Sequence, residues 1–502
     1  MSNFILGLQS LLDWHIILYI LIGAVVGLFV GAVPGLNDTN ILTLFLSFAI
    51  FMEPFPAIIL MTSVFIACQT AGAIPAILIN IPGTPSTAAT TLEGYELTKR
   101  GMAGQALGCS FASSMSGSIL GGVMALLFAP ILGKYALSFG PPEMFMLALF
   151  GMTAVASLTG SSITKGLLSA VLGLLVGTIG TDFFVGVTRS TFGILELCGG
   201  IPQVPLLLGL FGVSELYSLI GKKSIVSAEH QVSQTDTASQ WEGFKAAFRY
   251  RSTMLLSTII GFVIGVIPGT GATIASFTSY GIARSKSKEA AEFGKGCYEG
   301  LVATDTANNA SVPGSIVPAL TLGIPGSGTT VLFISVFMMH GLTPGPSFFS
   351  NFGAEANAIF LTVILVGILA TLAGMMATKY MAKIVSLPIS VLGPVIAAFC
   401  LLGAYICRGK VNDIYIMLAF SILAFFLKKF HYSLPAFLLG DILGSLIEPN
   451  FFRSLAISNN DYTVFFTRPI CIVLWALIVL TLVGPAAMSR RNRRKAKRQS
   501  AE

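Results

Sequence analysis

Long apolar stretches recur along the whole chain and are separated by short polar segments. Several approach or exceed the roughly 20 residues that cross about 30 Å of hydrocarbon at 1.5 Å per residue. Examples are residues 16–33, 103–132, 167–179, 254–267 and 470–483. Backbone amides in lipid must be satisfied within the segment, and the alternating pattern of barrel strands does not occur. The pattern therefore predicts an all-α polytopic membrane protein with about ten to twelve transmembrane segments.

The composition indicates that most of the chain is surrounded by lipid. Of the 502 residues, 54% are hydrophobic and 10% are charged, with a mean hydropathy of +0.84, whereas soluble domains carry about 25% charged residues. The formal charge of +7 comes mainly from a tail at residues 489–502. Such a tail could contact nucleic acid or anionic lipid, but directly after an apolar segment it is typical of a cytoplasmic anchor. We therefore expect the lipid bilayer, and no nucleic acid, among the partners. The basic residues of the tail are Arg490, Arg491, Arg493, Arg494, Lys495, Lys497 and Arg498.

A polar, basic segment at residues 221–251 divides the chain into two membrane halves, residues 1–220 and 252–488. Two blocks recur in the same order in both halves, which indicates a duplicated unit. The first copy begins after a segment without Lys or Arg, whereas the second begins after the basic linker, so we expect the two copies to be inverted repeats. We expect the linker and the tail to lie in the cytoplasm. The blocks are Gly27-Leu-Phe-Val-Gly31-Ala-Val-Pro34-Gly35 with Gly261-Phe-Val-Ile-Gly265-Val-Ile-Pro268-Gly269, and Ile74-Pro75 to Pro82-Gly83-Thr84 with Val317-Pro318 to Pro325-Gly326-Ser327.

The seven cysteines lie in apolar segments, without a CxxC pair and without histidines at metal-ligand spacing. We interpret them as packing residues and expect neither a metal site nor a cofactor. No Lys or Arg precedes the first apolar run, so the basic region of a cleavable signal is absent and we expect the first helix to be retained.

Proline and glycine interrupt an apolar helix in each half, at Pro82-Gly83 and at Pro325-Gly326. Proline removes a helical hydrogen bond, and glycine allows backbone angles that other residues avoid. Hydroxyl residues suited to N-capping follow both breaks, so we expect each break to start a new half-helix. Free amides at such an N-terminus bind anions, and carbonyls released before the break bind cations, as in secondary transporters. A kink that serves packing alone is the alternative interpretation.

The residues around the breaks are the candidate site. Asp38 and Asp305 are candidates for coupling to an ion, Na⁺ or H⁺, because ionisable side chains in apolar segments are costly. Asp441 is a further carboxylate of this kind. The candidate substrate-binding residues are Asn80, Gly83, Thr84, Ser86, Thr87, Asn308, Asn309, Gly326, Ser327, Gly328 and Thr329.

At these blocks the chain closely resembles the large membrane subunit of the tripartite tricarboxylate transporter family, over nearly its whole length. The resemblance implies a bacterial inner-membrane permease that works with a small membrane subunit and a periplasmic solute-binding protein delivering a carboxylate, with ion coupling. The residues that carry it are the run from Ala73 to Ser86, Glu93-Gly-Tyr95, Lys99-Arg-Gly101, Val266 to Gly271, Ser279-Tyr280, Phe293-Gly-Lys-Gly296, Glu299-Gly300, Asn308-Asn309-Ala310, Leu322 to Ser327, Gly341, Pro344-Gly-Pro346 and Thr467-Arg-Pro469.

The chain departs from the family pattern at two places near the proposed site. Asn37-Asp38 follows Pro34-Gly35-Leu36 where the family usually has glycine, and Thr304-Asp305-Thr306 stands where the family usually has Pro-Glu. Both changes alter polar groups, so we expect a small carboxylate, which could be a tricarboxylate, a dicarboxylate or a related organic acid.

Other functions are disfavoured by missing motifs. The HExxH, GxSxG and GxGD patterns of intramembrane and related enzymes do not occur, and neither does the GxxxxGK[ST] loop of ATP-driven pumps. We therefore expect a transporter and not an enzyme. A solute or ion channel remains as an alternative. A transport assay would separate the two, because a carrier shows saturable transport that depends on an ion gradient.

Overall fold

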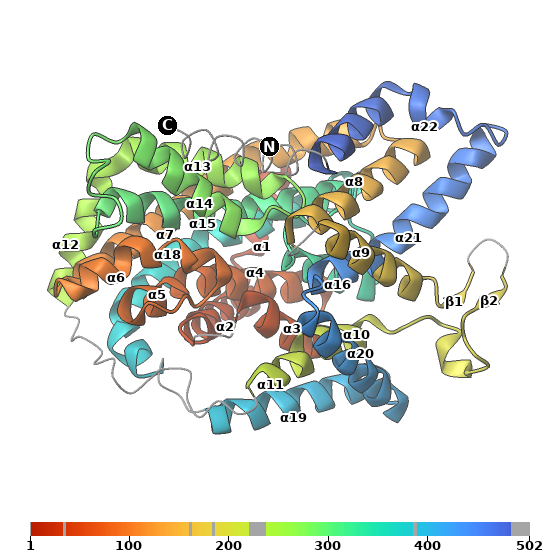
Figure 1. Ribbon diagram of the computed structural model, residues 1–502, viewed down its shortest axis with the longest axis horizontal. Helices are drawn as coiled ribbons and strands as arrows, with labels where there is room; N and C mark the ends of the chain where they lie inside the picture. Colours follow the sequence, from red (N-terminus) through yellow and green to blue (C-terminus); the bar gives the residue numbers. More distant parts are fainter. Residues whose placement is uncertain are drawn as a thin grey trace, which may run out of the picture. The chain divides into compact units, whose positions relative to one another are not determined.

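The computed structural model of the protein describes residues 2–33, 37–159, 163–182, 186–219, 237–384 and 389–482. Within them the ordered elements are helices, apart from one antiparallel pair of two-residue strands, β1 Gly180–Thr181 and β2 Thr188–Arg189 (Figure 1). The all-α fold class predicted from the sequence is therefore confirmed. The Pro34-Gly35 block and the basic tail lie outside the described residues.

The chain divides into two compact units. The first comprises Met1–Ala136 with Gln203–Leu423, and the second comprises Leu137–Pro202 with Ala424–Glu502. Each unit contains residues from both predicted halves, so the two compact units do not correspond to the two halves of the sequence. The helices of the first unit are α1 Ser2–Ser10, α2 Trp14–Gly31, α3 Asp38–Ala49, α4 Pro54–Ala71, α5 Ala73–Ile79, η1 Pro85–Ala88, α6 Thr91–Lys99, α7 Ala103–Ala136, α10 Gln203–Leu207, the π-helix η3 Leu208–Val213, α11 Ser214–Leu219, α12 Thr237–Ala247, η4 Phe248–Tyr250, α13 Arg251–Val266, α14 Gly271–Lys286, α15 Tyr298–Leu322, α16 Thr330–Met339, α17 Phe348–Asn351, α18 Gly353–Ile384 and α19 Ile389–Arg408. α20 Val411–Lys429 crosses the boundary, and the second unit holds α8 Pro141–Thr159, α9 Ile163–Gly177, η2 Leu195–Leu197, α21 Leu434–Ile457, α22 Val464–Thr467 and an apolar helix at Pro469–Leu482.

Five helices of the described chain are long and apolar enough to cross a bilayer, and five further apolar helices have 10–17 residues. A short helix crosses a membrane only together with a continuation beyond a break, so the total of ten to twelve segments stays a prediction. The long helices are Trp14–Gly31, Pro54–Ile79, Ala103–Ala136, Gly353–Thr378 and Val411–Lys429. The shorter ones are Ile163–Gly177, Gln203–Tyr217, Thr330–Met339, Ile396–Arg408 and Pro469–Leu482.

α4 and α15 form the centre of the first unit. The most apolar window of Pro54–Ile79 is 100% buried, and α15 is buried over nearly its whole length. A helix buried on all sides has no face for water, so its polar side chains must find partners inside the bundle. α5, which continues α4 after Gly72, ends at Ile79 before Pro82-Gly83, and α15 ends at Leu322 before Pro325-Gly326. The broken helices predicted from the sequence are confirmed.

Glycines allow α2 to approach α4 and α13 to approach α15 in the same way. A Cβ atom on Gly31 would lie 2.4 Å from the carbonyl oxygen of Cys68, and one on Gly265 would lie 2.3 Å from that of Ser311. Small residues let membrane helices pack backbone to backbone. The glycines shared by the two sequence blocks thus build the same helix pair twice, and α13, α14 and α15 lie side by side in Figure 1.

α7 and α18, each of which follows a break in its own half, pack antiparallel. Along α7 from Phe111 to Gly122, the contacts on α18 run backwards from Gly374 to Ile364. α15 instead runs in the direction of α7, because a Cβ on Gly117 would meet Thr306 and one on Gly121 would meet Ala310.

Part of the predicted polar linker is a packed helix. α12 crosses the start of α7, where Gly243 lies against the backbone of Gln105 and Gly108 against that of Gln240. Two glycines at the crossing remove the side chains that would hold the helices apart. Residues 220–236 lie outside the described residues.

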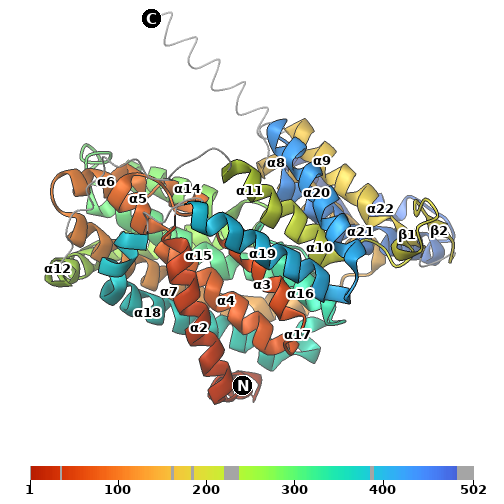
Figure 2. The same ribbon diagram turned by 90° about the horizontal axis from the view of Figure 1, so that it is seen from below.

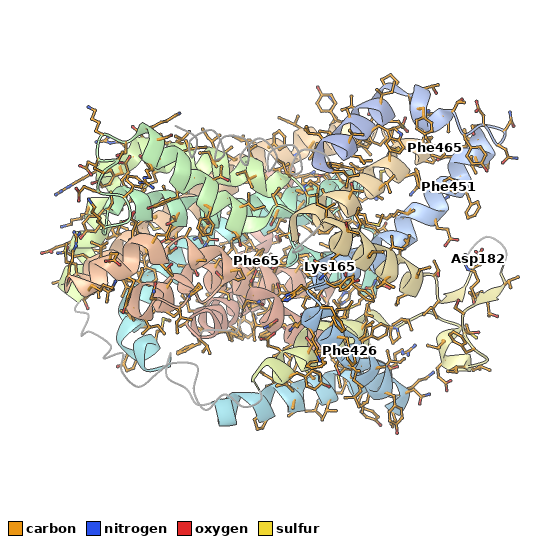
Figure 3. All side chains as sticks on the ribbon, viewed as in Figure 1. Phe65, Lys165, Asp182, Phe426, Phe451 and Phe465 are labelled. Atoms are coloured by element: carbon orange, nitrogen blue, oxygen red, sulfur yellow. The ribbon has the colours of Figure 1, made fainter. Side chains whose placement is uncertain are left out.

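Aromatic rings and ion pairs hold the second unit together. Phe451 and Phe465, labelled in Figure 3, stack with centroids 5.7 Å apart. Arg468 donates to Glu143 at 2.9 Å, and Arg189 donates to Glu448 at 2.7 Å. The candidate Asp441 lies in α21 of this unit.

Candidate functional site

The two breaks have the same backbone geometry. The last helical turn before each ends in a left-handed residue, Asn80 with φ 58° and Gly323 with φ 70°. Glycine and asparagine adopt this conformation most readily. In both breaks the next amide reaches back to a proline carbonyl, from Ile81 to Pro75 at 3.4 Å and from Ile324 to Pro318 at 3.3 Å. The repeated sequence block thus folds into a repeated turn.

Gly83 and Gly326 are explained by packing. A Cβ atom on Gly83 would lie 2.4 Å from the carbonyl oxygen of Gly31, and one on Gly326 would lie 2.7 Å from that of Gly265. The Gly83 amide donates to Gly72 at 3.1 Å, and the Gly326 amide donates to Ser315 at 3.3 Å. Each break is therefore pressed against the end of a neighbouring helix.

Hydroxyl groups cap the chain after both breaks. The Thr84 amide donates to Thr87 Oγ1 at 3.3 Å, and the Ser327 amide donates to Thr330 Oγ1 at 2.9 Å. The amides of Gly83, Thr84, Gly326 and Ser327, predicted to be free for an anion, are thus already bonded within the chain. The half-helix expected directly after the first break is also absent, because Thr84 and Pro85 begin the four-residue 3₁₀ helix η1. Proline has no N–H for a helical bond, and the Thr84–Thr87 cap closes a tighter turn.

A chain of buried hydrogen bonds joins the two breaks, and we call it the bridging network. Ser86 Oγ and Thr84 Oγ1 donate to Gln69 Oε1 at 2.7 and 3.3 Å. Gln69 Nε2 donates to Asp38 Oδ2 at 3.1 Å, and Thr329 Oγ1 donates to the same oxygen at 2.6 Å. The network contains polar groups from both halves, and its five side chains are 1–6% exposed.

Three helices and η1 position the bridging network. Asp38 lies in the first turn of α3, where Asn37 caps the helix and the helix dipole favours a negative charge. Gln69 lies near the end of α4, and Thr329 directly precedes α16, where its hydroxyl is free of any capping bond to that helix. α3, α4 and α16 lie together in Figures 1 and 2. Phe65, labelled in Figure 3, packs on Phe333 with ring centroids 6.0 Å apart and fixes α4 against α16.

A second buried group of polar residues surrounds Asp305, and we call it the Asp305 cluster. Thr90 Oγ1 and Ser110 Oγ donate to the two carboxylate oxygens of Asp305. Asn309 Nδ2 donates to the Asp305 backbone at 3.2 Å, and Thr70 Oγ1 donates to Asn309 Oδ1 at 3.1 Å. Thr70 and Gln69 are neighbours on α4, so the Asp305 cluster adjoins the bridging network.

One buried polar atom beside the bridging network has no protein partner among the described residues. Asn308 is 1% exposed, and its Oδ1 is unpaired while its Nδ2 makes a long bond of 3.5 Å to the Gln69 carbonyl. Buried polar groups normally have partners, so this unpaired acceptor next to Gln69 points to a bound species there.

The remaining candidates lie at the edge of this region. Asn80 is exposed, and Ser327 and Gly328 are half-buried. Asp441 lies in the other unit. No group of three His, Cys, Asp or Glu side chains that could hold a metal ion occurs in the described part of the chain.

Sequence reasoning missed Gln69, Thr70, Thr90 and Ser110. A signal was present, since Gln69-Thr70 interrupts the apolar run that begins at Val64, and Ser110 opens a serine-rich stretch of α7. A polar side chain inside a membrane helix faces the protein interior, and this rule would have found Gln69.

The Glu93-Gly-Tyr motif of the resemblance has a structural role. Glu93 is fully buried and accepts backbone N–H bonds from Gly294, Gly296 and Cys297 at 2.6–2.8 Å, and a hydroxyl bond from Tyr280 at 2.8 Å. Charge-assisted bonds of this kind are strong. They fasten α6 of the first half to the start of α15 in the second.

Comparison with known proteins agrees with the resemblance. The model of the tripartite tricarboxylate transporter TctA family matches residues 17–439. An Agrobacterium vitis relative, described as an uncharacterized 52.8 kDa protein in the TAR-I ttuC′ 3′ region, is 32% identical over 496 residues, which are 98% of each chain. A second one, from the TAR-II ttuC′ 3′ region, is 34% identical over 236 residues, or 46% of this chain and 97% of the relative. No solved structure gives a significant match.

Proposed function

Because the chain belongs to the tripartite tricarboxylate transporter TctA family, which is a family of membrane transporters, we propose that it is a secondary-active permease subunit that imports a small carboxylate. Its partners are a small membrane subunit and a periplasmic binding protein that delivers the carboxylate. It resides in the bacterial inner membrane with its C-terminal tail in the cytoplasm.

The bridging network is the observation that carries the proposed site. Secondary transporters bind substrate and ion between repeats, at interrupted helices. Here hydroxyls from both breaks and a buried carboxylate from α3 converge on Gln69. Thr84, Ser86 and Thr329 supply hydroxyl donors for a substrate carboxylate, and Asn308 Oδ1 supplies an acceptor. Because the amides of both breaks are already bonded, the hydroxyls replace them as the anion-binding groups.

Asp38 and Asp305 are the proposed ion-coupling residues. Each carboxylate is buried and accepts hydroxyl bonds, without a cationic side chain among its hydrogen-bond partners in the described chain. A buried negative charge without a cation costs on the order of several kcal/mol, and binding of Na⁺ or H⁺ would remove this cost. The antiparallel packing of α7 and α18 supports inverted repeats. In transporters built from inverted repeats, a site between the repeats opens alternately to the two sides of the membrane.

Uptake measurements test the proposal. Cells that express the chain with its two partner proteins are supplied with radiolabelled citrate, succinate or malate, with and without Na⁺ and with the proton gradient collapsed. A carrier gives saturable uptake that requires one of the gradients. Flux that does not saturate and persists without either gradient would instead identify a channel.

A further inference from the structure

Gln69 occupies a central position in the bridging network. Its side chain is 4% exposed and contacts Asp38 with one end and the hydroxyls of Thr84 and Ser86 with the other. The side chain therefore separates the proposed ion-coupling carboxylate from the proposed substrate-binding hydroxyls.

The chemistry of its neighbours fixes the orientation of the amide. An ionised carboxylate only accepts hydrogen bonds, so Asp38 requires the Nε2 end of Gln69. The Oε1 end then faces Ser86 and Thr84, whose hydroxyls donate to it. A hydroxyl has one proton, and the Ser86 and Thr84 hydroxyls also contact each other at 2.9 Å, so their two protons are taken up by Gln69 Oε1 and by that contact and are not available to a substrate carboxylate.

A cation at Asp38 reverses this requirement. Na⁺ on the carboxylate needs oxygen ligands, and a protonated, neutral carboxyl group presents an O–H donor that needs an acceptor, so in both cases the loaded group calls for the Oε1 end of Gln69. The amide satisfies it by rotating about its terminal bond, which exchanges Oε1 and Nε2. Nε2 then donates to Ser86, and one proton of the bonded Ser86–Thr84 pair becomes free to point toward a substrate carboxylate.

We propose that Gln69 is the residue that couples the ion to the substrate, by presenting Nε2 to an unloaded Asp38 and Oε1 to a loaded one. This inference rests on the proposed function and specifies how its two sites communicate. The coupling is reciprocal: the ion raises affinity for the carboxylate by the same factor by which the carboxylate raises affinity for the ion.

Binding of citrate, succinate and malate to the purified protein tests the inference. Na⁺ is varied at constant pH, and pH is varied at constant Na⁺, so that the effects of the two cations are measured separately. The Cys68 thiol is a titratable neighbour of Asp38, so the pH series is read together with the Asp38 variant below. In the wild type, saturating cation should raise affinity by roughly 5- to 150-fold. In Gln69→Met, which keeps the length but has no amide, the affinities with and without cation should become equal. Thr62→Val, at a buried position earlier on α4 whose hydroxyl donates to the Ile58 carbonyl, serves as the control and should keep the wild-type ratio.

Asp38→Asn supplies a reading that does not depend on folding of the Gln69 variant. The side-chain amide that this substitution introduces can donate to Gln69 Oε1 and so imitates the loaded carboxyl group. This variant should bind the carboxylate without cation as tightly as the loaded wild type does.

The outcomes separate the inference from the proposed function. A wild-type ion dependence that persists in Gln69→Met, or an Asp38→Asn variant with only the weak affinity of the unloaded state, overturns the role of Gln69 and leaves ion-coupled transport standing. A wild type whose binding does not respond to Na⁺ or pH, or that binds none of the three acids, overturns both.

Discussion

At the residue scale, the hydroxyl groups at the breaks fall into two kinds. Thr87 and Thr330 donate to backbone carbonyls of their own turns and serve as caps. Ser86 and Thr329 instead donate to side chains of other elements, Gln69 and Asp38. Only the second kind can exchange its partner for a substrate without opening the turn, and this distinction separates the proposed binding residues from the capping ones.

Ser86→Ala and Thr329→Val should weaken uptake while the protein still inserts. Loss of a buried hydrogen-bond partner typically costs about 1–3 kcal/mol, which corresponds to about 5- to 150-fold in affinity. The measurement is the apparent KM for the transported acid, at equal amounts of folded protein. Ser335→Ala and Thr62→Val, whose hydroxyls donate to the preceding helical turn, are matched controls and should keep the wild-type KM. An unchanged KM in both break variants would exclude these hydroxyls from the site.

Asp305→Asn should change the ion dependence of uptake. The amide of asparagine can accept from only one side, so Thr90 or Ser110 loses its acceptor, and no negative charge remains to attract a cation. We expect the Na⁺ or pH midpoint of uptake to shift. Asn309→Asp, which adds a carboxylate one turn further along α15, tests whether charge or packing matters. If Asp305→Asn only lowers the amount of protein and leaves the midpoint in place, Asp305 is structural.

At the element scale, the sequence predicted the breaks well and their surroundings poorly. Pro82-Gly83 and Pro325-Gly326 end their helices because proline and glycine act locally, so a local pattern suffices. Gln69 was missed because its role depends on α3, α4 and η1 coming together, which no single segment encodes. The free amides were predicted wrongly for two reasons. The amides of Gly83 and Gly326 donate to carbonyls of the preceding helical segment, Gly72 and Ser315, which the break folds back onto. The amides of Thr84 and Ser327 donate to the nearby hydroxyls of Thr87 and Thr330, which cap the turn itself.

Gly83→Ala and Gly326→Ala should lower stability. Their Cβ atoms would lie 2.4 Å from Gly31 O and 2.5 Å from Ser315 Cα, both of them backbone atoms that cannot rotate away. Overpacking of this kind typically costs about 1–3 kcal/mol. The readout is the thermal unfolding midpoint of the detergent-solubilised protein. Gly281→Ala, in α14 with nothing within 4 Å of the added Cβ, should be neutral or slightly stabilising. Equal midpoints in all three variants would mean that the breaks are not packed as the structure has them.

At the scale of the whole molecule, charge and helix direction together assign sides of the membrane. The end of α6 and the turn that follows carry Lys99 and Arg100, and the segment after α14 carries Lys288 and Lys295. Glu93 of α6 binds the second segment directly, so both basic segments lie on one face of the first unit. α7 leads away from that face to a contact between Gly133 and Phe349. The positive-inside rule therefore predicts that residues near Phe349 lie on the periplasmic side.

Labelling of single introduced cysteines in intact cells checks this assignment. The native cysteines are replaced first, because Cys198 and Cys407 are partly exposed. A membrane-impermeant maleimide should then modify Ser350→Cys, and it should modify Lys288→Cys and Ser227→Cys only after the cells are permeabilised. Ser350 and Lys288 are both exposed in the structure, so a difference in labelling reports the side of the membrane and not burial, while Ser227 lies outside the described residues and tests the linker alone. Labelling of Lys288→Cys from outside would reverse the topology and, with it, the direction from which the binding protein reaches the breaks.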